Sequence, residues 1–213
     1  MCFWSNDREI ELAGCDQDAN GQSLAGKLER TPRGRSFTPV EPALGHGSRY
    51  QVLGEGPGGV VVSYVYNSGG SGNFSGLGVY QLDEAHVVEK QAIHAGDRCH
   101  NGVRDAWIEG ETLFYRVSLT PAAVIRLGGQ DLSVGAYKLS DGAAICAGTV
   151  SFEMPLATGA SRPVAVELQP TAGADSCFDE ILATHLGRWH GSPGDAELTA
   201  LAEDYADHCK DKE

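Results

Sequence analysis

The chain has 213 residues, enough for one domain with a sizeable hydrophobic core or for two small domains. Its 29 acidic residues outnumber its 16 basic ones and give a formal net charge of −13, which disfavours nucleic acids and anionic membrane surfaces as partners. The 28 glycines favour many short strands joined by turns over a few long helices.

Residues 1–48 lack a clear hydrophobic period, and we predict that this N-terminal segment is largely irregular. A short strand is expected within residues 10–13. The proline-containing stretch at 30–42 is expected to be a coil or loop. Cys2 follows Met1 directly, which indicates a mature chain whose signal sequence has been removed. Cys2 is then a candidate lipid-bearing residue, and such a lipid is the only membrane attachment that we predict.

Residues 49–169 carry the strongest strand signals and are predicted to form a β core. Residues 60–66 are rich in Val and Tyr, residues 67–73 have the composition of a turn, and residues 74–82 form the next strand. These three segments predict a β-hairpin with a long tip. Further strands are expected at residues 87–93, 103–108, 113–117, 144–152 and 163–168.

A short mid-chain helix is predicted to begin at Thr120 and Pro121, because Thr caps helices and Pro favours the first helical position. Residues 170–213 are predicted to form a helical hairpin. Ser176 and Asp179 approximate a capping box at its start. The two helices are marked by apolar residues at helical spacing, namely Phe178, Ile181, Leu182, Leu186 and Trp189 in the first and Leu198, Leu201, Ala202 and Tyr205 in the second.

The six cysteines are dispersed and even in number, which is typical of disulfides formed in an oxidising compartment. The alternative is a cytosolic protein with buried thiols. In an antiparallel helical hairpin the ends at Cys177 and Cys209 come together, so a bridge between them is geometrically natural. Pairing by proximity adds Cys2–Cys15 and Cys99–Cys146. Lipid on Cys2 would leave one cysteine unpaired.

These elements predict a mostly β, α+β fold in a single domain spanning residues 1–213. We expect an antiparallel sheet or sandwich, a short mid-chain helix and a C-terminal helical hairpin stapled by a disulfide.

The densest polar cluster is residues 94–100, which contain His94, Asp97, Arg98, Cys99 and His100. One interpretation is a metal or catalytic site. The other is a loop at a strand end, with Asp97 and Arg98 in turns and Cys99 in a disulfide. We favour the second, because the spacing fits no standard zinc signature.

Residues 54–61 match the glycine pattern of a kinase phosphate loop, but the other kinase motifs are missing from the sequence. A glycine-rich turn that leads into the hairpin is therefore expected here. We assign no catalytic residue, no metal ligand and no cofactor from the sequence.

Two surfaces are candidates for binding a protein partner. The hairpin tip combines adaptable polar groups with aromatic anchors, a pairing common in protein recognition; its candidate residues are Tyr66, Asn67, Ser68, Ser71, Asn73 and Phe74. The helical hairpin has ten acidic and three basic residues, −7 of the total −13, and its candidates are Glu203, Asp204 and Asp207. The alternatives are a mobile hairpin end with its aromatics in the core and an ordinary solvated helix face.

The chain resembles the periplasmic immunity proteins that bacteria make against type VI secretion effectors, including phospholipase effectors. The resemblance is one of format: a short mature chain, a candidate lipid-bearing Cys2, several cysteines, an acidic balance and no catalytic motif. It implies a periplasmic inhibitor that plugs or masks the active site of a secreted effector. Separately, the acidic charge of the chain favours a basic partner. The alternatives are an inhibitor of a lysozyme-like enzyme and a small secreted hydrolase that uses the His94–His100 cluster.

Overall fold

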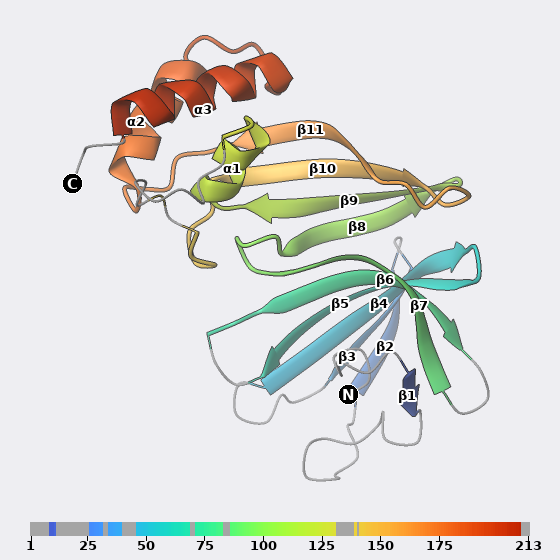
Figure 1. Cartoon of the computed structure of the whole chain (residues 1–213). Coiled ribbons are helices and arrows are strands. Elements are labelled where there is room, and N and C mark those ends of the chain that lie inside the picture. The colour runs from blue at the N-terminus through green and yellow to red at the C-terminus, as the bar shows by residue number, and fades with distance from the viewer. Residues whose placement is uncertain are drawn as a thin grey trace.

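The computed structural model describes residues 9–11, 26–31, 34–39, 46–68, 71–82, 86–130, 139 and 141–209. Side chains are described from Arg49 onward, except at positions 68, 82 and 86. Within these residues the chain forms two antiparallel sheets and three helices, so the predicted α+β class is confirmed (Figure 1).

The larger sheet has seven strands in the order β1-β7-β6-β5-β4-β3-β2. Valines and tyrosines, which favour strands, are frequent in its long central strand β5 (Gly59–Ser68). The tight turn between β4 and β5 requires a glycine at position 58, where φ is +84°. The strands are β1 (Glu9–Glu11), β2 (Gly26–Thr31), β3 (Gly34–Pro39), β4 (His46–Gly56), β5 (Gly59–Ser68), β6 (Phe74–Leu82) and β7 (His86–Asp97).

The smaller sheet has four strands in the order β11-β10-β9-β8. They are β8 (Val103–Glu109), β9 (Thr112–Leu119), β10 (Gly148–Pro155) and β11 (Arg162–Leu168). Helix α1 (Pro121–Leu127) follows β9, and α2 (Ser176–Leu186) and α3 (Asp195–Cys209) follow β11. Figure 1 shows this sheet between the helices and the seven-stranded sheet.

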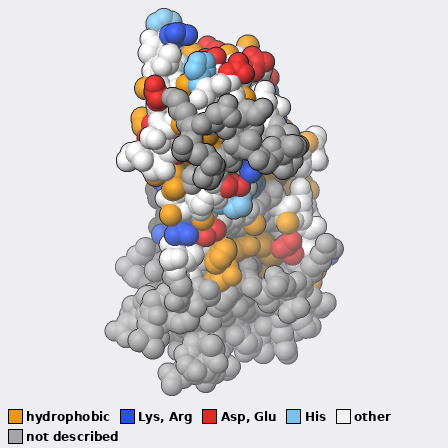
Figure 2. Space-filling model, turned by 60° about the vertical axis from the view of Figure 1, so that its left-hand side comes forward, with side chains coloured by type: hydrophobic (Ala, Val, Ile, Leu, Met, Phe, Trp, Pro, Cys, Tyr) orange, Lys and Arg blue, Asp and Glu red, His pale blue; other side chains and the backbone are white. Residues whose placement is uncertain are grey.

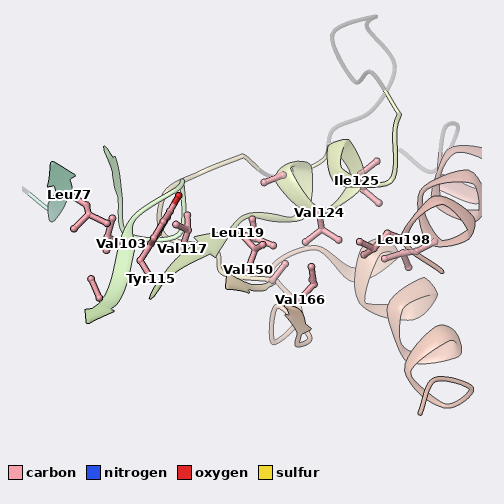
Figure 3. Close-up of a cluster of buried hydrophobic side chains, with 14 of the residues drawn as sticks. Leu77, Val103, Tyr115, Val117, Leu119, Val124, Ile125, Val150, Val166 and Leu198 are labelled. Carbon is pink, nitrogen blue, oxygen red and sulfur yellow. The ribbon is translucent and has the colours of Figure 1, made fainter. Parts of the chain in front are cut away.

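One hydrophobic core joins the three layers. Leu77 of the larger sheet meets Val103 and Tyr115 of the smaller one, and the same cluster continues to Val124 and Leu198 of the helices (Figure 3). A second cluster, centred on Val62, Tyr80 and Val87, belongs to the larger sheet alone. The smaller sheet therefore lies between the larger sheet and the helices and packs against both through one core.

Most local predictions are confirmed. The β5–β6 hairpin, the β8–β9 hairpin and the turn between β4 and β5 have the expected positions. Thr120 caps α1 by accepting a hydrogen bond from the backbone N–H of Ala123 at 3.1 Å. The Cys99–Cys146 and Cys177–Cys209 disulfides both form, whereas Cys2–Cys15 lies outside the described residues.

The expected irregularity of residues 1–48 is wrong for the described part of that segment. Strands β1, β2 and β3 and the start of β4 lie within it, and the predicted coil at 30–42 overlaps β2 and β3. These two strands pair antiparallel, with Arg30 opposite Arg35 and Thr31 opposite Gly34. In sequence, Pro32 falls between the strands and Pro39 ends the second, so the prolines mark strand ends.

Three elements differ from prediction by three residues or more at one or both ends. Strand β7 extends to Asp97 and includes His94, while β10 runs over residues 148–155 instead of 144–152. Helix α2 ends at Leu186, before Trp189. Its cap is Asp175 and not Ser176, because the Asp175 side chain accepts the backbone N–H of Phe178 at 3.1 Å.

Asp179 holds the preceding turn instead of completing a capping box. Its carboxylate accepts hydrogen bonds from the backbone N–H groups of Thr171 at 2.6 Å and Gly173 at 2.8 Å. Burial alone would raise the pKa of Asp179, but these hydrogen bonds outweigh it and lower the pKa.

Substitution of Phe178 tests the packing of the helical layer. Its side chain is fully buried (0%), and its ring centre lies 6.4 Å from that of Tyr205. Phe178→Ala should lower the free energy of unfolding by about 3–5 kcal/mol, because a large cavity remains. Urea unfolding followed by circular dichroism measures this. Val164→Ala, at a side chain that is 47% exposed on β11, should change it by less than about 0.5 kcal/mol. A loss below about 1 kcal/mol in Phe178→Ala would contradict the packing described here.

Candidate functional site

Two regions that stand apart in the sequence meet at one end of the larger sheet. The β5–β6 hairpin brings Tyr66, Asn67, Asn73 and Phe74 to the turn formed by residues 97–102, which leads from β7 to β8. We call this group the tip corner. The backbone N–H of Asn73 donates to Oδ1 of Asp97 at 2.8 Å, and the backbone N–H of Arg98 donates to the carbonyl of Asn73 at 3.2 Å.

The tip corner presents an aromatic side chain to solvent on a fixed support. Phe74 pairs with Tyr66 across the hairpin, and their rings stack with centres 5.2 Å apart. Phe74 nevertheless keeps 39% of its surface exposed. Gly72 lies against the ring, since an added Cβ would come within 2.8 Å of it. The side-chain amide of Asn67 donates to Oδ1 of Asn73 at 3.2 Å and joins the two strands of the hairpin next to the stacked pair.

The supporting turn is tightly wound and internally bonded. Arg98 and Asn101 have left-handed backbone conformations, with φ of 44° and 60°, and at Arg98 this costs roughly 1 kcal/mol or more. Glycine is required on both sides. An added Cβ on Gly96 would lie 2.3 Å from the backbone of Asn101, and one on Gly102 would lie 2.2 Å from the carbonyl oxygen of Arg98.

Asp97 is the centre of the polar contacts in this turn. Its Oδ1 accepts hydrogen bonds from the backbone of Asn73 and from Nε of Arg98 at 3.1 Å, and its Oδ2 accepts one from Nη2 of Arg98 at 3.3 Å. Its backbone exchanges hydrogen bonds with His100 at 2.8 and 2.9 Å. The carboxylate is therefore used in holding the turn and the tip together.

The turn is also anchored to the smaller sheet and to α1. Cys99 bonds to Cys146, and its backbone N–H donates to the carbonyl of Ala143 at 3.0 Å. The segment around Cys146 is held in turn by Asp141, which accepts hydrogen bonds at 2.7 Å from Thr120 Oγ1 and from Arg126 Nη2. The anchoring contacts thus run from the cap of α1, through Asp141 and the disulfide, to the tip corner.

Asp141 is suited to this anchoring role because it stays ionised. Burial alone would raise the pKa of its carboxyl. The hydrogen bonds from Arg126 and Thr120, together with the charges of Arg126 and His100, outweigh burial and hold the pKa below its ordinary value.

The two histidines of the 94–100 cluster do not form a common site. His94 lies on β7 with its ring near those of Tyr115 and Phe152, at 6.0 and 6.4 Å, and its Nε2 contacts the carbonyl of Asn101 at 3.0 Å. His100 is exposed. In the part of the chain that the structure describes, no group of three or more His, Cys, Asp or Glu side chains is arranged to hold a metal ion. The turn interpretation of this cluster therefore fits the geometry better than the metal interpretation.

The acidic candidates occupy α3, away from the hairpin in sequence. Glu203 and Asp207 are exposed. Asp204 is tied to the buried His185, with Oδ2 and Nε2 2.8 Å apart, although 47% of its side chain remains exposed. Ser71 is exposed in the tip, and the side chain of Ser68 lies outside the described residues. Figure 2 shows acidic side chains gathered at one end of the molecule and apolar side chains across the middle of the same face.

The supporting residues of the tip corner were not predicted in this role. Asp97 and Arg98 were assigned to turns, but nothing local in the sequence indicates that Asp97 reaches Asn73, 24 positions away. The one usable signal is the pair of glycines, Gly96 and Gly102, that flank the cluster. Nothing in the sequence around Asp141 and Arg126 indicates that these residues support the tip corner.

No protein-family model, curated protein or solved structure shows a significant match to this chain. Among the described helices, none has the length and apolar character that a membrane crossing requires.

His94 gives the fold a testable pH dependence. Burial lowers its pKa from the ordinary value of 6.5, although the hydrogen bond with Asn101 opposes this. The unfolded chain then binds this proton more tightly than the folded one, so stability is lost as the pH falls below about 6.5. In wild type, the free energy of unfolding should fall between pH 7 and pH 5. His94→Gln should flatten part of that fall, whereas His190→Gln, at an exposed position, should not. Equal slopes in wild type and His94→Gln would rule out this role.

Proposed function

We propose that this protein is a periplasmic binding protein that neutralises a secreted effector or lytic enzyme by direct contact, with the tip corner as its main contact surface. The observation that carries the proposal is the exposed Phe74 ring, which rests on Tyr66 and is supported by a hydrogen-bonded turn.

A fixed aromatic side chain is an effective anchor for a protein partner. Aromatic residues dominate the binding energy of many interfaces when they enter a pocket. Ordering a flexible loop on binding would cost free energy, and a surface that is already held avoids part of that cost. At the tip corner, the Asn67–Asn73 bond and the Asn73–Asp97 bond hold the backbone beside Phe74 before any partner arrives.

The charge of the chain favours a basic partner. The net charge of −13 is concentrated in residues 170–213, and Glu203 and Asp207 are exposed on α3. Opposite charges raise the rate of encounter, while the contacts at the centre of an interface determine how long the complex lasts. We therefore assign steering to α3 and the lasting contact to the tip corner.

The cysteines support a site of action outside the cytoplasm. The two described disulfides indicate maturation in an oxidising, extracytoplasmic environment. Within the proposal, that compartment is the periplasm, Cys2 carries lipid, and the partner is a type VI secretion effector of the phospholipase kind. A lysozyme-like enzyme is the alternative partner. The hydrolase alternative is less well supported, because His94 is packed among aromatic rings while His100 is exposed.

Co-expression tests the proposed function directly. The full chain is produced together with the product of the adjacent gene, and the two are tested for co-purification and for loss of the partner's toxic or lipolytic activity. A basic lysozyme, assayed for inhibition by the purified protein, tests the alternative. Failure to bind or inhibit either enzyme would refute the proposal.

Phe74 should contribute most to the stability of the complex. Phe74→Ala should weaken binding by about 2 kcal/mol, roughly thirtyfold, mainly through faster dissociation. Surface plasmon resonance with the purified partner measures both rates. Val164→Ala is the matched control, because Val164 is also apolar and exposed (47%) but lies on β11. Equal affinities for wild type and Phe74→Ala would exclude the tip corner as the contact surface.

The exposed acidic residues of α3 should affect the association rate and leave the dissociation rate unchanged. The double variant Glu203→Gln/Asp207→Asn should bind more slowly at low salt and depend less on salt, with an unchanged dissociation rate, because exposed charges are screened over about 10 Å at 0.1 M ionic strength. Asp204 is left intact because it holds His185. The control Glu109→Gln/Glu167→Gln makes the same charge change at exposed positions of the smaller sheet. If both doubles slow association equally, net charge acts without a specific face.

A further inference from the structure

We infer that the Cys99–Cys146 disulfide is a redox gate on the tip corner, so that the protein becomes competent to bind its partner only after this bridge has formed outside the cytoplasm. The inference rests on the proposed function for its biological meaning. Its structural half is that the tip corner depends on the bridge, and this is inferred from the contacts of the turn without reference to any partner.

The bridge lies at the centre of the supporting turn. Cys99 is flanked by Arg98, whose backbone N–H donates to the carbonyl of Asn73, and by His100, which exchanges backbone hydrogen bonds with Asp97. A shift of Cys99 therefore acts directly on Arg98 and, through His100, on Asp97, the two residues that hold the tip. Cys99 is itself 5% exposed, while Cys146 is half-buried and is therefore the more exposed of the two cysteines.

The turn needs an external tether because its backbone is unfavourable. Arg98 and Asn101 adopt left-handed conformations that non-glycine residues rarely take, and such residues persist only where surrounding contacts hold them. The surrounding contacts include the bridge and the Cys99–Ala143 hydrogen bond, which both lead to the segment anchored by Asp141. Opening the bridge removes the covalent part of this tether and leaves Arg98 free to relax.

The second described bridge has a different position. Cys177–Cys209 joins the start of α2 to the end of α3, and both cysteines lie far from residues 66–74 and 97–102 in sequence. The chain thus supplies its own control, because one bridge supports the tip corner and the other supports the helical layer.

Closing the gate is a thiol–disulfide exchange. The thiols of Cys99 and Cys146 lose two electrons and two protons as their S–S bond forms. A disulfide-bearing oxidoreductase accepts both electrons and protons and becomes a dithiol. In the reducing cytoplasm the bridge stays open, so the tip corner would be assembled only after export.

Amide hydrogen exchange measured by NMR tests the structural half. The reporters are the amides of Asn73 and Arg98, which make the two backbone contacts between the tip and the turn. In Cys99→Ser/Cys146→Ser both amides should exchange at least about tenfold faster, as expected for a local opening, while strand amides at Val61 and Val79 keep their protection. In the control Cys177→Ser/Cys209→Ser both reporters should be unchanged. Unchanged exchange of both reporters in folded Cys99→Ser/Cys146→Ser would overturn the inference.

A second measurement covers the case in which the double serine variant does not fold. Wild type is reduced with dithiothreitol at a temperature where it stays folded, the freed thiols are alkylated, and mass spectrometry identifies the opened bridge. Faster exchange of the reporters in molecules alkylated at Cys99 and Cys146 supports the gate. Unchanged exchange in those molecules overturns it.

Binding separates the gate from the proposed function. If opening the bridge leaves about one molecule in ten with an assembled tip corner, Cys99→Ser/Cys146→Ser should bind the partner about tenfold more weakly, and the control double should match wild type. If oxidised wild type binds no partner, the proposed function fails and the exchange data still decide the structural half. If the Asn73 and Arg98 amides exchange faster in Cys99→Ser/Cys146→Ser but its affinity for the partner is unchanged, the bridge does not control binding.

Discussion

The Asp97 carboxylate is the contact on which the tip corner depends. It receives the backbone N–H of Asn73 and the guanidinium of Arg98, so one side chain joins a hairpin end to a turn that lies 24 positions further along the chain. Only 18% of the Asp97 side chain is exposed, and partial shielding strengthens charge-assisted hydrogen bonds relative to those at an open surface. Without this contact the hairpin end would keep the Asn67–Asn73 bond, the ring stack and the backbone hydrogen bond from Arg98 to Asn73, but it would lose the charge-assisted link between Asn73 and the turn.

The unusual backbone of the turn follows from the topology. Strand β7 belongs to the larger sheet and β8 to the smaller one, so residues 97–102 must carry the chain from one sheet to the other. The start of this crossing is fixed by the pairing of Asp97 with Phe74. Its end is fixed by two hydrogen bonds: the backbone N–H of Ser118 donates to the carbonyl of Gly102, and the backbone N–H of Val103 donates to Ser75 Oγ at 2.7 Å. The crossing must therefore be short and tight, which explains the flanking glycines. The candidate contact surface lies where the two sheets are joined, on a rigid base.

Features set by neighbouring residues could be predicted from the sequence, whereas features set by distant pairing could not. Thr120 before Pro121 is a local cap signal, and the cysteines at the ends of α2 and α3 follow from helical spacing, so both predictions hold. Pro32 and Pro39 favoured the prediction of a coil at residues 30–42, yet in sequence Pro32 falls between β2 and β3 and Pro39 ends β3, positions where proline is compatible with a sheet. Asp97 could be assigned to a turn but not to Asn73, because that contact needs the register of three strands, β5 to β7, with a bulge between Leu77 and Gly78.

In the proposed function, three properties of an inhibitor are assigned to different parts of the molecule. The association rate would depend on exposed carboxylates of α3, which act at long range and tolerate imprecise placement. The lifetime of the complex would depend on Phe74, which acts only at contact and needs the fixed geometry that Asp97 provides. The proposed redox control would depend on Cys99 and Cys146, whose bridge supports the same turn. Because the association rate and the lifetime use different elements, each can change without the other. The lifetime of the complex and its redox control depend on the same turn, residues 97–102. A change that loosens this turn would therefore also weaken the complex after the bridge has formed.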